Sequence, residues 1–185
     1  MNRNAVLSAC LVFLGVCMTD MRAEGSTIVT RSLKQIVDGS EFIFEGRAVS
    51  KEVRPSLVSG MPFTYFTFEI LEVVKGIYPY PTIEIAYMGG PSGELTLKVS
   101  DMRMPEVGER GIYFAENLEN QQIHPLVGWQ QGHYLIYPNA KTGRDTVVPA
   151  QYETAGIRGR ALMTTHGIPL DDFKQNIQDI MGEGR

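Results

Sequence analysis

Three histidines are the side chains in this sequence best suited to bind a metal or transfer a proton. His124, His133 and His166 have acids such as Glu116 and Glu119 near them in the chain, and imidazole with carboxylate is a ligand set that Zn²⁺ accepts. The spacing does not fit this chemistry, because there is no HExxH helix and no closely spaced pair of ligands. We therefore expect no metal and no cofactor, and histidines that are exposed or satisfied by neighbouring groups.

The usual signatures of nucleophilic catalysis are also missing from the sequence. There is no Gly-x-Ser-x-Gly elbow, and the only thiols, Cys10 and Cys17, lie in an N-terminal leader. Ser59 and Ser92 each precede a glycine at a predicted loop tip, where serine is a common turn residue. The glycine-rich run 89–93 lacks the following lysine and helix of a phosphate-binding loop. No catalytic residue is predicted from these motifs.

Three carboxylates near a predicted turn leave an enzymatic alternative open. Asp101, Glu106 and Glu109 are close in sequence, and two carboxylates can act as general acid and general base without a sequence motif. Charged turns are more often simply solvated. A hydrolase that uses these loop acids is therefore the alternative to a protein without enzymatic activity.

Aromatic side chains in predicted loops are the candidate ligand contacts. The only tryptophan, Trp129, stands in the sequence GWQQG at 128–132, between two predicted strands. An indole beside amides can stack on a sugar or a peptide, although a lone tryptophan near a strand start more often closes one end of a barrel core. Tyr78 and Tyr80 alternate with prolines in a stiff extended connector. These three residues are the predicted ligand-binding residues.

The elements that must position these side chains are mostly strands. Alternating apolar residues predict two long strands, Phe42 to Val53 and Thr64 to Val74, with Gly46 where the first strand bends. A hairpin with a glycine-rich tip is expected from the runs Thr82 to Met88 and Glu94 to Val99. Shorter strands are expected at 112–115, 122–127, 132–137 and 146–148.

Helical spacing occurs near the two ends of the predicted domain. The pattern over 33–37 predicts a short helix, with Thr30 as its cap and Gly39 in a left-handed conformation after its last turn. Near the C-terminus, two aspartates precede an apolar stripe from Phe173 to Met181, which predicts an amphipathic helix. No element is assigned to residues 151–167.

These elements together predict a mainly β fold. Long strands with a central glycine must bend, and closing a sheet removes its exposed edges. We therefore expect an OB-like barrel, closed or partly open, with a short N-terminal helix and an amphipathic C-terminal helix.

The N-terminus has the layout of a secretory signal peptide. Arg3 precedes the uncharged run Ala5 to Met18, and Ala23 supplies a small residue before a cleavage site. The run is shorter than the roughly 20 residues that a membrane-spanning helix needs. We expect residues 1–23 to be a signal peptide and residues 24–185 to form a single OB-like domain that is secreted or periplasmic.

The cysteine positions bear on lipid anchoring, and the net charge bears on the class of partner that we expect. Cys10 ends a run similar to a bacterial lipobox, but the apolar region continues past it, and Val16 stands where a small residue should precede Cys17. A lipid anchor is therefore only the alternative to a free mature chain. The net charge of −4 at pH 7, without a basic run interleaved with aromatics, argues against nucleic acid as a partner. We also expect no transmembrane segment in the mature chain.

Several strand and turn motifs resemble those of uncharacterised secreted bacterial β-domains. The motifs are SEFIFEGRA at 40–48, YFTFEILEVVKG at 65–76, MGG at 88–90, VGERGIYF at 107–114 and QG at 131–132. Such domains are vaguely similar in architecture to the OB-fold modules of netrin and of tissue metalloproteinase inhibitors. The resemblance implies export and a β fold but no activity. The inhibitor mechanism does not carry over, because it needs an N-terminal cysteine and a disulfide core.

The functional hypothesis from the sequence is an exported, non-enzymatic binding module. Its ligand is a protein, a glycan or a component of the cell envelope, held by loops of the barrel. The alternatives are a secreted hydrolase that uses loop carboxylates and a structural protein of the envelope.

Overall fold

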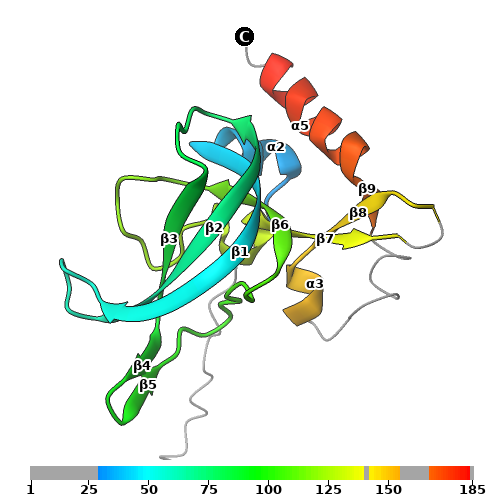
Figure 1. The fold of residues 1–185 in the computed structure, drawn as a ribbon. Helices are drawn as coiled ribbons and strands as arrows, with labels where there is room; N and C mark the ends of the chain where they lie inside the picture. The colour runs from blue at the N-terminus through cyan, green and yellow to red at the C-terminus, as the bar shows by residue number, and fades with distance from the viewer. Residues whose placement is uncertain (1–28, 140–141, 155–166, 184–185) are drawn as a thin grey trace, which may run out of the picture.

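The computed structural model describes residues 29–139, 142–154 and 167–183, so the predicted signal peptide, its two cysteines and His166 lie outside the described residues. Within these ranges the chain is mainly β (Figure 1). The strands are β1 (Phe42–Pro55), β2 (Pro62–Lys75), β3 (Thr82–Met88), β4 (Gly90–Ser92), β5 (Leu95–Leu97), β6 (Arg110–Ala115), β7 (His133–Pro138), β8 (Asp145–Pro149) and β9 (Ile168–Pro169). The helices are α2 (Leu33–Asp38), η1 (Trp129–Gly132), α3 (Gln151–Thr154) and α5 (Leu170–Glu183).

One antiparallel sheet contains seven of these strands, in the order β3-β2-β1-β6-β7-β8-β9. Figure 1 shows the sheet curving strongly along the long hairpin of β1 and β2. At Gly46 of β1 a Cβ atom would come within 2.6 Å of the ring of Phe44. Register shifts between β1 and β2 flank this position. The two predicted long strands are therefore confirmed, and the register shift beside Gly46 is an irregularity of the kind that bends a strand.

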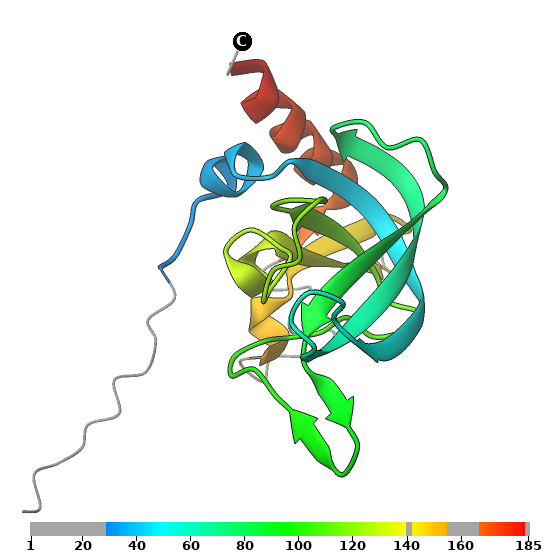
Figure 2. The same cartoon turned by 90° about the vertical axis from the view of Figure 1, so that its left-hand side faces the viewer.

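The predicted hairpin between residues 82–88 and 94–99 is wrong. β3 pairs with β2 instead, and β4 pairs with β5 in a separate small sheet that projects from the main one (Figure 2). Gly89 and Gly90 have φ angles of 116° and 131°, which turn the chain out of the main sheet. As a result Leu95, which alternation had placed on one face with Leu97 and Val99, is 77% exposed.

A second predicted strand, residues 122–127, does not form. Within the described residues it forms one isolated bridge, between Leu126 and Ala115, and otherwise belongs to the long connection between β6 and β7. The shorter strands at 112–115, 132–137 and 146–148 are confirmed, each within a residue or two at its ends, as β6, β7 and β8. Residues 151–154 form helix α3, where the sequence had given no assignment.

The short N-terminal helix is confirmed, but its caps differ from the prediction. Ser32, not Thr30, caps α2 and forms a capping box with Gln35. Gly39 has a φ of −75° and is right-handed, and its Cβ would lie 3.1 Å from the carbonyl oxygen of Gln35. The last carbonyl groups are satisfied by the Ser40 hydroxyl and by the Lys75 ammonium, so a left-handed glycine is not needed.

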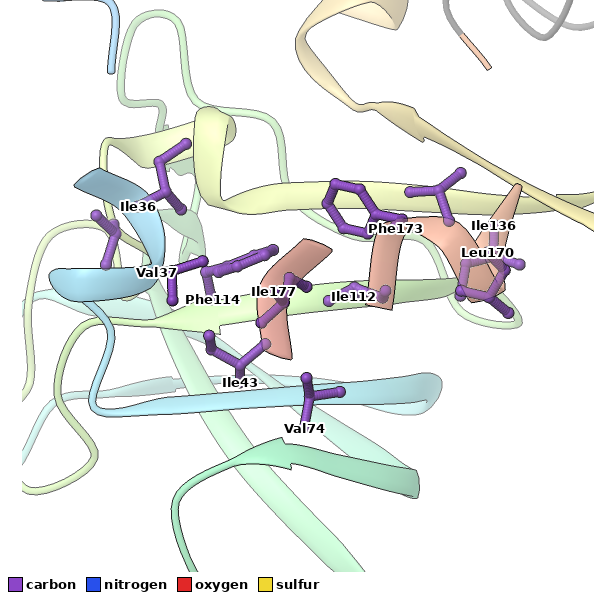
Figure 3. Close-up of a cluster of buried hydrophobic side chains, with 12 residues drawn as sticks. Ile36, Val37, Ile43, Val74, Ile112, Phe114, Ile136, Leu170, Phe173 and Ile177 are labelled. Atoms are coloured by element: carbon purple, nitrogen blue, oxygen red, sulfur yellow. The ribbon is translucent and has the colours of Figure 1, made fainter. Parts of the chain in front are cut away.

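Two apolar clusters lie on opposite faces of the sheet. On one face, α2 and α5 pack over β1, β6, β7 and β8 (Figure 3), and the amphipathic C-terminal helix is therefore confirmed. On the other face, the curved strands enclose a core of mostly aromatic side chains. The first cluster includes Ile36, Val37, Ile43, Ile112, Phe114, Phe173 and Ile177, and the second includes Phe42, Phe44, Phe66, Phe68, Tyr87 and Tyr113.

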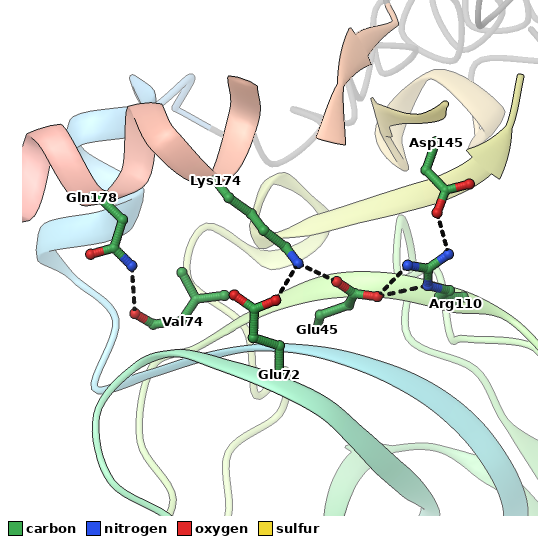
Figure 4. A network of polar contacts seen from close by, with 7 residues as sticks. All are labelled: Glu45, Glu72, Val74, Arg110, Asp145, Lys174 and Gln178. Atoms are coloured by element: carbon green, nitrogen blue, oxygen red, sulfur yellow. Dashed lines mark hydrogen bonds and ion pairs between the residues drawn. The ribbon is translucent and has the colours of Figure 1, made fainter. Parts of the chain in front are cut away.

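A network of ion pairs adds to the apolar contacts of α5 (Figure 4). Glu45 of β1 is buried, and its carboxylate binds Arg110 of β6 and Lys174 of α5. Arg110 also binds Asp145 of β8, and Lys174 also binds Glu72 of β2. Four strands and the helix therefore meet at one charged cluster.

No strand pairing joins β3 to β9 in the described residues, so hydrogen bonds between strands do not close the sheet into a barrel. In the same residues no helix is long and apolar enough to cross a membrane.

Candidate binding site

β3 is one of the two edge strands of the sheet, so one of its sides has no neighbouring strand in the described residues. In an antiparallel strand, the N–H and C=O groups of alternate residues point to opposite sides. The N–H of Gly89 binds the carbonyl oxygen of Pro62 beside β2, whereas the N–H of Met88 points away from β2 and binds Ile123. The backbone groups of Glu84 and Ala86 therefore also point away from β2. They have no hydrogen-bond partner in the described part of the chain.

The opposite edge of the sheet offers much less. β9 is two residues long, ends in Pro169 and continues directly into α5. A short edge with a proline is a common way to prevent a further strand from pairing. β3 has seven residues and contains neither proline nor lysine, so of the two edges it is the one that can accept a strand.

A pocket of about 180 Å³ lies beside the free edge of β3. One wall is formed by Glu84, Ile85 and Ala86, and the other by residues 117–122 of the connection between β6 and β7. The hydrogen bond from the N–H of Met88 to the carbonyl oxygen of Ile123, at 3.0 Å, joins the two walls at one end. The pocket therefore occupies the gap between β3 and the loop that approaches it.

Side-chain hydrogen bonds fix the loop wall of this pocket. The side chain of Gln121 contacts the buried hydroxyl of Ser56 and donates to the hydroxyl of Tyr65 at 2.9 Å. The carboxamide oxygen of Asn117 accepts from the backbone N–H groups of Glu119 and Asn120. Because these bonds connect the loop to the β1–β2 hairpin and to itself, the pocket is largely formed before any ligand arrives.

The pocket is rich in hydrogen-bond acceptors. The carbonyl oxygen of the Gln122 side chain is buried and has no hydrogen-bond partner in the described residues. The carboxylate of Glu119 also lines the pocket and forms no ion pair there. Glu84 differs, because its carboxylate binds the guanidinium of Arg54, which also stacks on the ring of Tyr65. A buried acceptor without a donor is costly and calls for an explanation.

The aromatic residues predicted to bind a ligand lie at the two ends of one chain of ring contacts. Tyr80 is 65% exposed and precedes β3, whereas Tyr78 is half-buried against Phe42. Trp129 is half-buried and stacks on His124, with ring centroids 5.5 Å apart. The contacts run in the order Tyr80, Tyr78, Phe42, Phe44, Tyr113, Phe68, Phe66, Tyr87, His124 and Trp129.

The backbone at Trp129 is unusual for so large a residue. Its φ is 61°, in the left-handed region, and the preceding Gly128 has a φ of 60°. This turn places the indole ring over the imidazole of His124. The structure thus places Trp129 and Tyr78 in packing contacts, and leaves Tyr80 as the exposed one of the three.

The two described histidines are buried rather than exposed. The Nδ1 of His124 accepts from the N–H of Leu126, and burial, with the nearby His133, lowers the pKa of His124 to about 3. This imidazole is therefore neutral at physiological pH, and its Nε2 has no hydrogen-bond partner in the described residues. His124 also contacts Tyr87, whose pKa is raised by burial.

His133 belongs to a second buried polar group, around Glu109. The Nε2 of His133 lies 2.9 Å from Glu109, and the guanidinium of Arg103 and the hydroxyl of Tyr113 bind the same carboxylate. Burial alone would raise the pKa of Glu109, but the contacts with His133 and Arg103 outweigh it and lower the pKa to about 2. The imidazole also stacks on the ring of Tyr113, which explains its burial.

The described residues can be compared with the two chemical hypotheses from the sequence, a zinc site and a hydrolase that uses loop carboxylates. No group of three or more histidine, cysteine, aspartate or glutamate side chains within the described ranges is arranged to hold a metal ion. Of the three loop acids, Glu109 is committed to Arg103 and His133, and a carboxylate with a pKa near 2 is a weak general base. Asp101 and Glu106 are exposed.

Sequence reasoning missed the residues of the β3 pocket. Glu84 and Ala86 belong to a strand that the sequence predicted, but which edge of that strand stays free depends on its pairing with β2. Gln122 and Glu119 were placed in or near a strand that does not form. The only sequence signal was the polar run 116–122 between two predicted strands.

No protein-family model matches this chain, and neither curated proteins nor solved structures include a significant match to it. The resemblance to secreted bacterial β-domains therefore stays a prediction.

Proposed function

We propose that this protein is an exported, non-enzymatic binding module that accepts an extended segment of another protein as an added strand along β3. The observation that carries the proposal is the row of unpaired backbone groups at Glu84 and Ala86 beside a preformed pocket. Strand addition obtains affinity from backbone hydrogen bonds and specificity from pockets for alternate side chains. Both features are present at this edge.

The finer fold assignment belongs to the same proposal. The strongly bent seven-stranded sheet, with its aromatic core and flanking helices, is compatible with a partly open OB-like barrel. In such a barrel the gap between β3 and the β6–β7 connection is the place where closure is incomplete. Secretion or a periplasmic location rests on the leader at residues 1–23.

A separate partner fits this edge better than a second copy of the chain. Two copies paired through β3 would bring the acidic loops that carry Glu116 and Glu119 toward each other. Like charges that face each other across an interface are unfavourable. The exposed Tyr80 just before β3 offers an aromatic contact for one end of a bound segment.

A peptide selection tests the proposal without a known ligand. Random ten-residue peptides displayed on phage are selected on the purified protein, and synthetic versions are measured by calorimetry. We expect bound peptides to slow hydrogen exchange at the N–H groups of Glu84 and Ala86, because these groups gain partners.

Ala86→Pro supplies the decisive variant. Proline removes the N–H that points away from β2, so the ladder with β2 and the melting temperature should be preserved. Peptide binding should weaken at least tenfold. Ala86→Ser keeps the N–H and is the matched control. Peptides that bind Ala86→Pro equally well, a selection that yields no binder, or self-association abolished by Ala86→Pro would each contradict the proposal.

A further inference from the structure

The pocket beside β3 points to the chemistry of the side chain that a partner brings. We propose that it binds a positively charged side chain, the ammonium of lysine or the guanidinium of arginine. This inference rests on the proposed strand addition for the source of that side chain, but the pocket can be tested separately.

The hydrogen-bonding groups of the pocket favour a donor. The side-chain oxygen of Gln122 is buried without a partner, and an ammonium or guanidinium group supplies only donors. A neutral hydroxyl can satisfy the same oxygen, but hydrogen bonds with a charged partner are stronger. Gln122 therefore favours a cation over a neutral side chain.

The charges around the pocket point the same way. Glu119 lines it and forms no ion pair in the described part of the chain. Glu84 lies on the opposite wall, and Arg54 neutralises it through two contacts. The guanidinium of Arg54 also lies over the ring of Tyr65, 3.5 Å from the ring centroid. These contacts hold Arg54 in place, and it does not act as a counter-ion for Glu119. One carboxylate is thus left for a ligand.

The size of the pocket suits the end of one long side chain. Its volume of about 180 Å³ corresponds to about six water molecules of liquid. Alternate residues of an added strand project to the same side, so one residue of a bound segment can place its side chain in the pocket while its neighbours face away.

The experiment uses n-butylammonium and methylguanidinium ions, which carry the head groups of lysine and arginine. Each is titrated into the ¹⁵N-labelled protein and followed by heteronuclear NMR. We expect millimolar binding with shifts at the amides of 84–86 and 117–122. Butyrate and n-butanol, which have similar size without a positive charge, should leave these amides unchanged.

Two variants and one control locate the effect. Gln122→Leu should weaken cation binding about tenfold, because a charge-assisted hydrogen bond is lost. Glu119→Gln should weaken it about three- to fivefold, as an exposed ion pair contributes less. Glu116→Gln removes the same charge from the same loop but does not line the pocket, so its affinity should be close to that of the parent.

Three results would overturn the inference: no pocket shifts with either cation, equal shifts with n-butanol, or an effect of Glu116→Gln as large as that of Glu119→Gln. The strand proposal fails separately. If selected peptides bind β3 but tolerate norleucine at every lysine and arginine, the cation inference is wrong and strand addition stands. If the cations bind and no peptide does, the pocket assignment stands and strand addition is wrong.

Discussion

Two carboxylates, the buried Glu45 and the mostly buried Glu109, lie on opposite sides of the bent sheet and are stabilised by different parts of the chain. Glu45 binds Arg110 and Lys174, which are 65 and 129 residues away in sequence. Glu109 binds Arg103, only six residues away, and the more distant His133. The first network holds distant elements together, and the second fixes a turn against the aromatic core.

The basic residues that bind these two carboxylates also differ in the other ion pairs that they form. Arg110 retains Asp145 and Lys174 retains Glu72 if Glu45 is lost. Glu109 is instead shared by the guanidinium of Arg103 and by the imidazole of His133, which is only 1% exposed, so its loss removes two contacts of mostly buried groups at once. Similar ion-pair chemistry therefore predicts unequal costs, and neither carboxylate lines the β3 pocket. Variants at both sites thus probe stability separately from binding.

The largest effect is expected for Glu109→Ala. Removing one member of a buried ion pair typically costs about 3–5 kcal/mol, and the side chains of Glu109 and Arg103 are only 11% and 13% exposed. Urea unfolding at pH 7 measures the change in free energy. Glu106→Ala, in the same loop but exposed, should change stability by less than about 0.5 kcal/mol. Equal effects of the two substitutions would show that the contacts of Glu109 contribute little.

The depressed pKa of Glu109 predicts a comparable effect of pH. A carboxyl with a pKa of about 2 in the folded state and 4.5 when unfolded adds about 3 kcal/mol of stability. This stability is present above pH 4.5 and is lost as the pH falls toward 2. Glu109→Gln should therefore be less stable than the parent at pH 6. The difference between their free energies of unfolding should become smaller below pH 4.5.

His124 changes stability in the same pH direction and must be separated from Glu109. Burial lowers its pKa from 6.5 to about 3, so protonation of the unfolded chain destabilises the fold as the pH falls below 6.5. This contribution is common to the parent and to Glu109→Gln, and it cancels in their difference. A difference in free energy of unfolding that stays constant between pH 6 and pH 3 would contradict the role assigned to Glu109.

A smaller loss is expected for Glu45→Ala, about 2–3 kcal/mol, since both of its cationic partners keep a second carboxylate. The loss should include detachment of α5, seen as faster hydrogen exchange over 170–183. Glu109→Ala should not accelerate exchange there beyond its global effect. If Glu109→Ala rather than Glu45→Ala selectively accelerated hydrogen exchange in α5, the roles assigned to the two carboxylates would be wrong.

The smallest effect, about 1 kcal/mol, is expected for Lys174→Met. The substitution keeps the apolar stem over the sheet and removes only the ammonium, while Glu45 retains Arg110. Thermal unfolding measures the difference. The matched control is Lys34→Met, which removes an exposed pair with Asp38 and should cost less than about 0.5 kcal/mol. A loss larger than that of Glu45→Ala would mean that Lys174 has a further role in holding α5.

Local sequence patterns determined the long strands and the two flanking helices. The alternation in β1 and β2, the glycine at the bend and the apolar stripe of α5 were all readable, because each depends on residues a few positions apart. The failures were also local in origin. The run 94–99 alternates like a core strand, but Gly89 and Gly90 direct it out of the sheet, and position 39 had looked like a left-handed cap.

Tertiary structure alone decided the environment of each polar group. The sequence singled out Glu109 as a loop acid but gave no sign that Glu45 is buried, since its partners come from β6 and from α5. It predicted β3 without showing that the backbone at Ala86 would stay unpaired. Strand pairing and burial depend on contacts between residues far apart in the chain, and a short-range pattern does not specify those contacts.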